Sequence, residues 1–197
     1  MHRRNFIAAA LAATFAPNLL AREPIVGGRC QGCEQAFAGM PEALSERARI
    51  GAADENGEPM TVTGAVRDAA GQPAPGIIVY AYQTDSGGIY PKAATARGGL
   101  RAWVRTDMAG RYRFDTIRPG AYPGRQVPQH IHMHVIEPGL ATYYLASIEF
   151  EDDPLLMDHH RRRHTSGRGG SGLAMPRRDD DGRWHVERDI TLRLNLD

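Results

Sequence analysis

The feature that most restricts the fold of this chain is a series of short strand-like runs that begins near Met60 and continues to the C-terminus. Some runs alternate apolar and polar residues, as in MTVTGAV, and others are continuously apolar, as in GIIVYAYQ. Alternation is typical of half-buried strands, and a short continuous apolar run is typical of a strand buried on both faces. Gly or Pro stands at nearly every junction. The pattern predicts an all-β sandwich and no alternation of strands with helices.

The later runs follow one another without an internal repeat. We expect residues 101–107 and 111–117 to form a hairpin about the turn MAG. Further strands are expected at residues 130–137, 142–150 and 184–196.

Three segments depart from the strand pattern. PEALSERARIG, residues 41–51, is a short helical candidate. The run DHHRRRHTSGRGGSG, residues 158–172, is polar and rich in glycine, so we expect a solvated surface loop; adventitious metal binding by His159, His160 and His164 is the alternative. DDDG at residues 179–182 predicts a hairpin turn.

Length and charge limit the class of protein. The 197 residues suffice for one domain with a proper core. A net charge of +1 produces no field that would concentrate polyanions, which argues against a general nucleic-acid or acidic-membrane binder. A homo-oligomer stays open.

The first residues, MHRRNFIAAALAATFAPNLLA, predict export. Arg3 and Arg4 precede an Ala/Leu-rich run that is shorter than the ~20 apolar residues needed to span a bilayer. Twin arginines before a modest apolar region predict a Tat-type signal peptide over residues 1–21. We therefore expect a periplasmic or secreted protein without stable membrane association after signal removal. An uncleaved anchor is the alternative, because Leu19 is bulky for a cleavage site.

Residues 22–59 form an N-terminal segment with Cys30 and Cys33 in RCQGCE. In an oxidising compartment two cysteines most simply make one disulfide. A zinc knuckle would need two further ligands nearby, and a thioredoxin-like pair would need a βαβ context; the segment has neither.

Three histidines occupy alternate positions in PGAYPGRQVPQHIHMHV, namely His130, His132 and His134. Successive side chains of a strand alternate between faces, so all three would project from one face. Neutral imidazole is the commonest metal ligand, and two at this spacing can converge on one ion. A strand whose polar face carries histidines without any ligand role is the alternative.

Two tyrosines close to this strand stand in Pro/Gly settings, Tyr90 in GGIYP and Tyr122 in PGAYPG. A rigid loop can aim a phenol, whereas tyrosines within strands normally pack or line pockets. Phenolate is a hard anionic donor with an ordinary pKa near ~10, so only a strong Lewis acid would deprotonate it at neutral pH. Ferric iron meets that demand, whereas zinc and magnesium prefer other ligands.

The succession VTGAVRDAAGQPAPG, VYAYQTDSGGIY, RTDMAGRYRFDTIRPGAYP, PQHIH and FEDDPLL resembles the intradiol ring-cleavage dioxygenases, and more closely their exported protocatechuate 3,4-dioxygenase-like branch. The resemblance runs from about Cys30 to the C-terminus. It implies a transthyretin-like (prealbumin-like) β-sandwich over residues 60–197 with long loops, preceded by a short helical or irregular segment. It also implies non-haem Fe(III) with four ligands, which are Tyr90, Tyr122, His130 and His132.

The implied reaction is cleavage of a catechol between its two hydroxyl-bearing carbons by O2, giving a cis,cis-muconate. In this mapping Tyr122 is both a ligand and a catalytic base that leaves the metal during turnover. Arg125 is the candidate for stabilising developing negative charge. His134 is not a ligand and contacts the surroundings of the site.

Two positions depart from the family pattern. Val127 stands where active members carry an arginine, and Ser147 where they carry a glutamine. An iron-binding homologue with weak activity is therefore one alternative. Another is a non-catalytic module of the carboxypeptidase-regulatory type, whose turns are similar but which has no reason to keep Tyr90 together with HIH.

The aromatic residues also suggest a substrate preference. IIVYAYQ and the pair Tyr143 and Tyr144 predict a largely aromatic pocket. Such a lining favours neutral, alkyl- or aryl-substituted catechols over protocatechuate.

Overall fold

The computed structural model describes residues 24–28, 32–91 and 99–196. One sheet contains β1 (Arg47–Arg49), β2 (Pro59–Arg67), β5 (Arg111–Ile117), β10 (Arg177–Arg178), β11 (Trp184–Glu187) and β12 (Ile190–Thr191). The other contains β3 (Ile78–Gln83), β4 (Arg101–Arg105), β6 (His130–Glu137), β7 (Ala141–Tyr144), β8 (Ile148–Phe150) and β9 (Leu173–Ala174). The described helices are the 3-10 helix η1 (Cys33–Ala36) and α1 (Asp158–His164).

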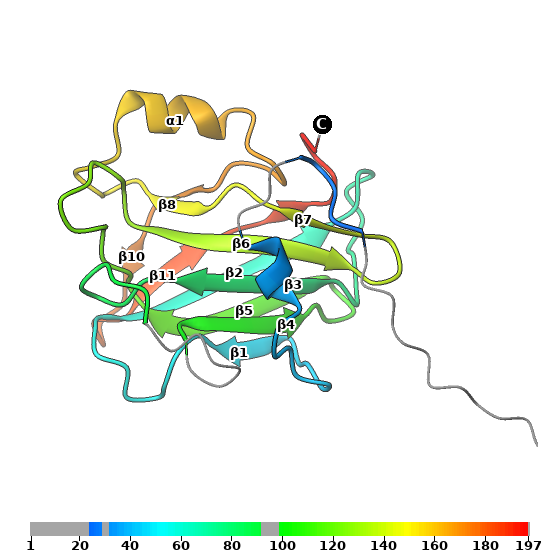
Figure 1. The fold of residues 1–197 in the computed structure, drawn as a ribbon, viewed down its shortest axis with the longest axis horizontal. Coiled ribbons are helices and arrows are strands. Elements are labelled where there is room, and N and C mark those ends of the chain that lie inside the picture. Colours follow the sequence, from blue (N-terminus) through cyan, green and yellow to red (C-terminus); the bar gives the residue numbers. More distant parts are fainter. Residues whose placement is uncertain (1–23, 29–31, 92–98, 197) are drawn as a thin grey trace, which may run out of the picture.

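The two sheets pack face to face (Figure 1), which confirms the all-β sandwich. The first has the strand order β1-β5-β2-β11-β10, with β12 also paired to β2. The second has the order β4-β3-β6-β8-β9, with β7 also paired to β6. Strand β6 therefore lies at the centre of the second sheet.

Alternation along β6 divides its side chains between two environments. Ile131, Met133 and Val135 are buried in the core between the sheets, where they join residues such as Val62 and Phe114 of the first sheet. The histidines occupy the intervening positions and face away from that core.

A smaller apolar cluster covers one end of this outer face. It contains Ala36 of η1 together with Tyr80, Trp103 and Ile136. The Trp103 indole donates a hydrogen bond to the Ala36 carbonyl at 2.6 Å, which ties the N-terminal segment to the sheet. The other end of the face carries the candidate site.

Two local expectations near the first sheet were wrong. The helical candidate at residues 41–51 contains β1, which pairs in parallel with β5 and is followed by the buried Ile50. Residues 101–117 do not form a two-stranded hairpin, because β4 pairs with β3 in one sheet and β5 pairs with β2 in the other. The turn itself exists, since the Gly110 amide donates to the Asp107 carbonyl at 2.9 Å. Each strand pairs where its apolar face can be buried, and a turn signal does not say where that is.

The expectation of a solvated loop at residues 158–172 was also wrong. The segment begins with α1, and His160 and His164 are buried. Each imidazole accepts a hydrogen bond from a backbone amide at 3.0 Å, from Met157 and Gly172 respectively. Histidines that cap the local backbone in this way stabilise a polar segment that hydrophobic periodicity does not reveal.

Other expectations on this side of the molecule fared better. The turn at residues 179–182 is confirmed between β10 and β11, which pair antiparallel. The single strands expected at 142–150 and 184–196 are each broken into two, β7 and β8 or β11 and β12.

Two expectations concern the N-terminal part of the chain. The signal at residues 1–21 and Cys30, the predicted disulfide partner of the buried Cys33, lie outside the described residues. Within those residues no helix is long and apolar enough to cross a membrane.

Candidate metal centre

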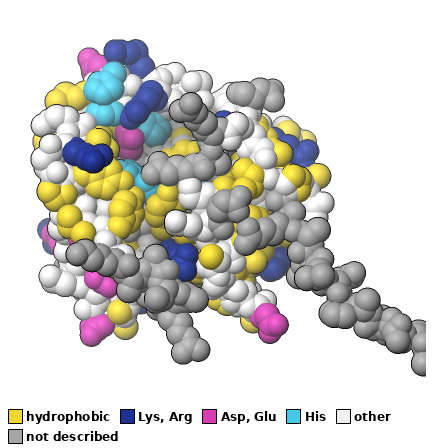
Figure 2. Space-filling model, viewed as in Figure 1, with side chains coloured by type: hydrophobic (Ala, Val, Ile, Leu, Met, Phe, Trp, Pro, Cys, Tyr) yellow, Lys and Arg dark blue, Asp and Glu magenta, His cyan; other side chains and the backbone are white. Residues whose placement is uncertain are grey.

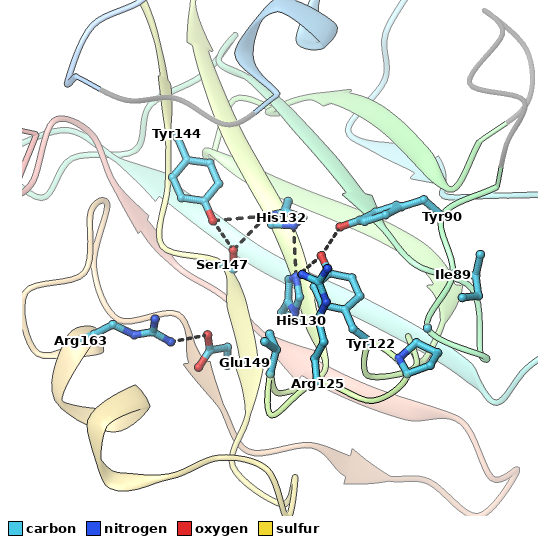
Figure 3. Close-up of a pocket in the computed structure, with 13 residues that line it drawn as sticks. Ile89, Tyr90, Tyr122, Arg125, His130, His132, Tyr144, Ser147, Glu149 and Arg163 are labelled. Atoms are coloured by element: carbon cyan, nitrogen blue, oxygen red, sulfur yellow. Dashed lines mark hydrogen bonds and ion pairs between the residues drawn. The ribbon is translucent and has the colours of Figure 1, made fainter.

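Four side chains that the sequence singled out meet at one end of β6 (Figure 3). His130 and His132 come from the strand, Tyr90 from the loop after β3 and Tyr122 from the loop between β5 and β6. The two tyrosine loops are joined by the Gly120 amide, which donates to the Asp85 carbonyl at 2.8 Å, and the Thr84 hydroxyl, which donates to the Gly120 carbonyl at 2.8 Å. These contacts fix one phenol relative to the other.

The donor atoms of the four side chains form a continuous series of short contacts. The Tyr90 and Tyr122 Oη atoms are 2.8 Å apart, Tyr122 Oη is 3.1 Å from His130 Nε2, and His130 Nε2 is 3.1 Å from His132 Nε2. The Pro128 carbonyl accepts a hydrogen bond from His130 Nδ1 at 2.7 Å. His130 therefore directs its Nε2 lone pair toward the other donors. Two oxygens and two nitrogens thus lie in one cluster of donor atoms.

The electrostatics of the cluster suit a cation. Burial, together with the neighbouring His130 and His134, lowers the pKa of His132 to about 3, so this imidazole is neutral at physiological pH. Burial raises the pKa of the Tyr90 phenol well above its ordinary value, and its hydrogen bond with Tyr122 adds to the rise. Only a strongly Lewis-acidic cation would hold Tyr90 as a phenolate.

The donor set fits ferric iron. No group of three or more His, Cys, Asp or Glu residues that could hold a metal occurs in the part of the chain that the structure describes. The tyrosines are therefore needed to complete a four-donor set here. Phenol oxygens are hard donors and imidazole nitrogens suit iron, so the mixed set fits ferric iron better than zinc, which prefers thiolate, imidazole or carboxylate, or calcium, which takes oxygen ligands.

The second nitrogen of His132 faces two hydroxyls. His132 Nδ1 lies 3.3 Å from Tyr144 Oη and 3.4 Å from Ser147 Oγ, and these hydroxyls are 2.5 Å apart. Hydrogen bonds to the outer nitrogen orient a ligating imidazole. Ser147, the position where the family carries glutamine, thus contacts a predicted ligand directly.

His134 packs among aromatic rings and lies outside the donor cluster. It is fully buried, with ring centres 5.5 Å from Tyr80, 5.9 Å from Tyr82 and 5.2 Å from Tyr144. That His134 is not a ligand stays a prediction.

The FEDDPLL motif supports the start of β6. The buried Asp153 carboxylate accepts a hydrogen bond from the Gln129 amide at 2.6 Å. Arg118 donates to the Gln129 side chain at 2.8 Å and pairs with Asp152 at 2.7 Å. The residue that precedes His130 is therefore held from both its backbone and its side chain.

The donors open into a cavity of about 720 Å³. Its lining comprises Gly88, Ile89, Tyr90, Tyr122, Pro123, Arg125, Val127, His130, His132, Tyr144, Ser147, Glu149 and Arg163. All five predicted site residues lie in it. The exposed Arg125 places its guanidinium carbon 6.0 Å from the centre of the Tyr122 ring.

The lining differs from the aromatic pocket that the sequence suggested. Of the tyrosines named for that pocket, Tyr144 lines the cavity, whereas Tyr80 and Tyr143 are fully buried. Sequence reasoning missed Glu149 and Arg163. Glu149 lies on β8, where it pairs with His130 of β6, and Arg163 lies on α1. Glu149 could be found only from the register between β6 and β8. Arg163 could be found only by a prediction that included helix α1.

The chain is similar to known dioxygenases in sequence. A family model described as "Dioxygenase" matches residues 36–166. The protocatechuate 3,4-dioxygenase beta chain of Burkholderia cepacia is 34% identical over 120 residues, which cover 52% of this chain and 50% of the relative. A catechol 1,2-dioxygenase of Pseudomonas sp. strain EST1001 is 32% identical over 140 residues, which cover 61% and 46%. The chain thus spans about half the length of these curated relatives.

Solved structures share the fold. The dioxygenase domain of a dioxygenase carbohydrate-binding protein fusion from Streptomyces sp. SirexAA-E has a TM-score of 0.59 at 25% identity, covering 79% of this chain and 92% of that one. Catechol 1,2-dioxygenase from Pseudomonas arvilla C-1 has a TM-score of 0.60 at 21% identity, covering 76% and 58%. With a family model matched over most of its length, the chain belongs to the intradiol ring-cleavage dioxygenase family.

Proposed function

We propose that this protein is a non-haem Fe(III) intradiol dioxygenase that cleaves a catechol with O2 to a cis,cis-muconate. The observation that carries the proposal is the convergence of two phenol oxygens and two imidazole nitrogens within successive contacts of 2.8, 3.1 and 3.1 Å. Tyr90, Tyr122, His130 and His132 would hold the ion. The chemistry that ferric iron supplies, when bound, is activation of a chelated catechol ring toward O2.

The residues around the donors have defined tasks in this proposal. Tyr122, held as a phenolate, would accept a proton at Oη from a catechol hydroxyl. His130 and His132 stay fixed through the Pro128 carbonyl and the hydroxyls of Tyr144 and Ser147. Arg125 lies at the cavity, where a guanidinium stabilises negative charge that develops on the substrate.

Because Val127 is apolar, Arg125 is the residue of this loop that brings a positive charge to the cavity. Val127 also lines the cavity, close in sequence to Arg125 on the same loop. The Arg125 side chain is exposed and less constrained than a buried guanidinium, so we propose slow turnover relative to members with an arginine at the Val127 position.

Purified protein from iron-replete cells tests the proposal. We expect about one ferric ion per chain and a red-brown colour from tyrosinate-to-iron charge transfer. Catechol should consume O2 and gain both oxygen atoms, and the product should be a dicarboxylate; the extradiol product has the same mass but carries an aldehyde. A colourless protein with stoichiometric zinc would refute the assignment, and a product of extradiol type would refute the reaction.

A matched pair of variants tests the ligand set. Tyr90→Phe removes one donor oxygen and should lose most of the iron. Tyr82→Phe is the control, because the Tyr82 ring stacks on His132 at 4.5 Å and its hydroxyl lies outside the donor series. Equal iron contents in the two variants would show that Tyr90 is not a ligand.

A further inference from the structure

A second cavity of about 460 Å³ lies beside the one that contains the metal donors. Tyr144, Ser147, Glu149 and Arg163 line both spaces. Pockets for drug-sized ligands measure roughly 300–1,000 Å³, and each of the two spaces falls in that range. A bare catechol that chelates the metal would therefore leave the second space unused.

The residues whose hydroxyls face His132 are shared by the two cavities. Tyr144 and Ser147 contact His132 Nδ1 and line both spaces. A catechol held at the donor atoms would therefore need a side chain of several atoms to reach into the second cavity.

The second cavity is polar and carries an excess of positive charge. Arg163 and Arg168 line it together with one carboxylate, that of Glu149. Glu149 is already paired on the helix side, with Oε2 at 3.2 Å from His164 Nε2. Ser166 and Asn195 add groups that can form hydrogen bonds. Figure 2 shows basic, acidic and histidine side chains gathered on the same part of the surface, near α1.

Arg163 is the guanidinium with unused capacity. Its contact with Glu149 is long, at 3.4 Å, and its side chain is 63% exposed. Arg168, in contrast, donates to the carbonyls of Tyr144 and Gly27. A guanidinium has five N–H donors in a planar fork that matches a carboxylate. Arg163 can therefore take a second carboxylate while it stays near Glu149.

We propose that the second cavity is a subsite for an acidic side chain on the catechol ring, with Arg163 as the residue that recognises its carboxylate. The proposal rests on the dioxygenase function and adds the substrate class, catechols whose carboxylate stands several atoms from the ring.

Binding of matched ligands to the iron-loaded full chain tests this subsite. The probes are 3-(3,4-dihydroxyphenyl)propanoate, its neutral methyl ester and protocatechuate, titrated without O2 and followed by the visible spectrum. We expect the propanoate to bind about tenfold more tightly than the ester, since a charge-assisted hydrogen bond at an exposed guanidinium contributes at the lower end of its range. Protocatechuate should lack this advantage, because its carboxylate is attached directly to the ring.

Variants on α1 and beside it identify the residue. Arg163→Gln should abolish the preference for the propanoate over the ester, whereas Arg162→Gln, an exposed neighbour outside both cavities, should keep it. Ser166→Trp should fill the second space and weaken the propanoate more than protocatechuate. Arg163→Gln decides alone if Ser166→Trp fails to fold.

Equal binding of acid and ester would overturn the subsite, as would the same loss in Arg163→Gln and Arg162→Gln. These results differ from a failure of the proposed function. A chain that binds no iron and consumes no O2 with any catechol would refute the dioxygenase itself, whereas one that cleaves catechol without preferring the acid would refute only the subsite.

Discussion

Two adjacent aspartates in FEDDPLL should differ sharply in what they contribute to stability. Asp153 is 5% exposed, and its carboxylate accepts backbone hydrogen bonds from Gln129 at 2.6 Å and Leu155 at 2.8 Å. Asp153→Ala leaves two amides without these acceptors. Each unsatisfied buried amide costs about 1–3 kcal/mol, so the free energy of unfolding should fall by roughly 2–6 kcal/mol, toward the lower end where water enters.

Asp152→Ala is the matched control. Asp152 is exposed and pairs with Arg118, and that guanidinium also lies over the rings of Phe150 and Trp184 at 5.2 and 4.8 Å. Losing this bidentate pair costs about 1 kcal/mol, the upper end for surface pairs, because the Arg118 side chain is only 12% exposed; Arg118 keeps its contacts with the two rings and with Gln129. Comparing the two variants therefore separates the stability contributed by the backbone hydrogen bonds to Asp153 from that contributed by the ion pair of Asp152 with Arg118.

Urea unfolding of the metal-free protein measures the difference. A loss of about 2 kcal/mol should move the midpoint of Asp153→Ala by roughly 1 M, and Asp152→Ala should move it much less. Because Asp153 holds the residue before His130, Asp153→Ala should also weaken iron binding in an equilibrium titration. An equal midpoint shift in both variants would refute this account of the motif.

Three further predictions concern charged residues. Arg125→Ala should lower turnover and leave the iron colour intact; an unchanged rate would return Arg125 to the category of surface charge. Burial opposes ionisation of Glu149, but His164 and Arg163 hold its pKa below the ordinary 4.5, so its contribution to stability is present above pH 4.5 and is lost as pH falls through the folded pKa. Glu149→Gln should therefore flatten the acid limb of stability measured by urea unfolding at a series of pH values, and an unchanged limb would contradict this. Replacing Arg3 and Arg4 with lysine should retain the protein in the cytoplasm, as cell fractionation would show, whereas unchanged export would point to another route.

The sequence predicted the strands whose pattern is local and misjudged how they pair. β6 matches its expected range because alternation extends over the whole strand. The pairing of β4 and β5 was mispredicted because a turn signal indicates that the chain reverses without indicating which sheet each strand joins. Helix α1 was missed because two buried histidines stabilise it through backbone amides, and histidine in a polar run resembles a solvated segment.

The candidate site also has one part that local sequence patterns predict and one part that they do not. One wall consists of β6 and the two tyrosine loops, and it could be read from the sequence because alternate histidines and Pro-flanked tyrosines are local features. The other wall consists of β8 and α1, and it depends on the register that places Glu149 opposite His130 and on a helix that brings Arg163 to the same cavity. The first wall holds the donor atoms and Arg125, and the second holds Glu149 and Arg163. Substitutions of the four donor residues should therefore change whether iron binds, and substitutions in the second wall should change which catechol is preferred.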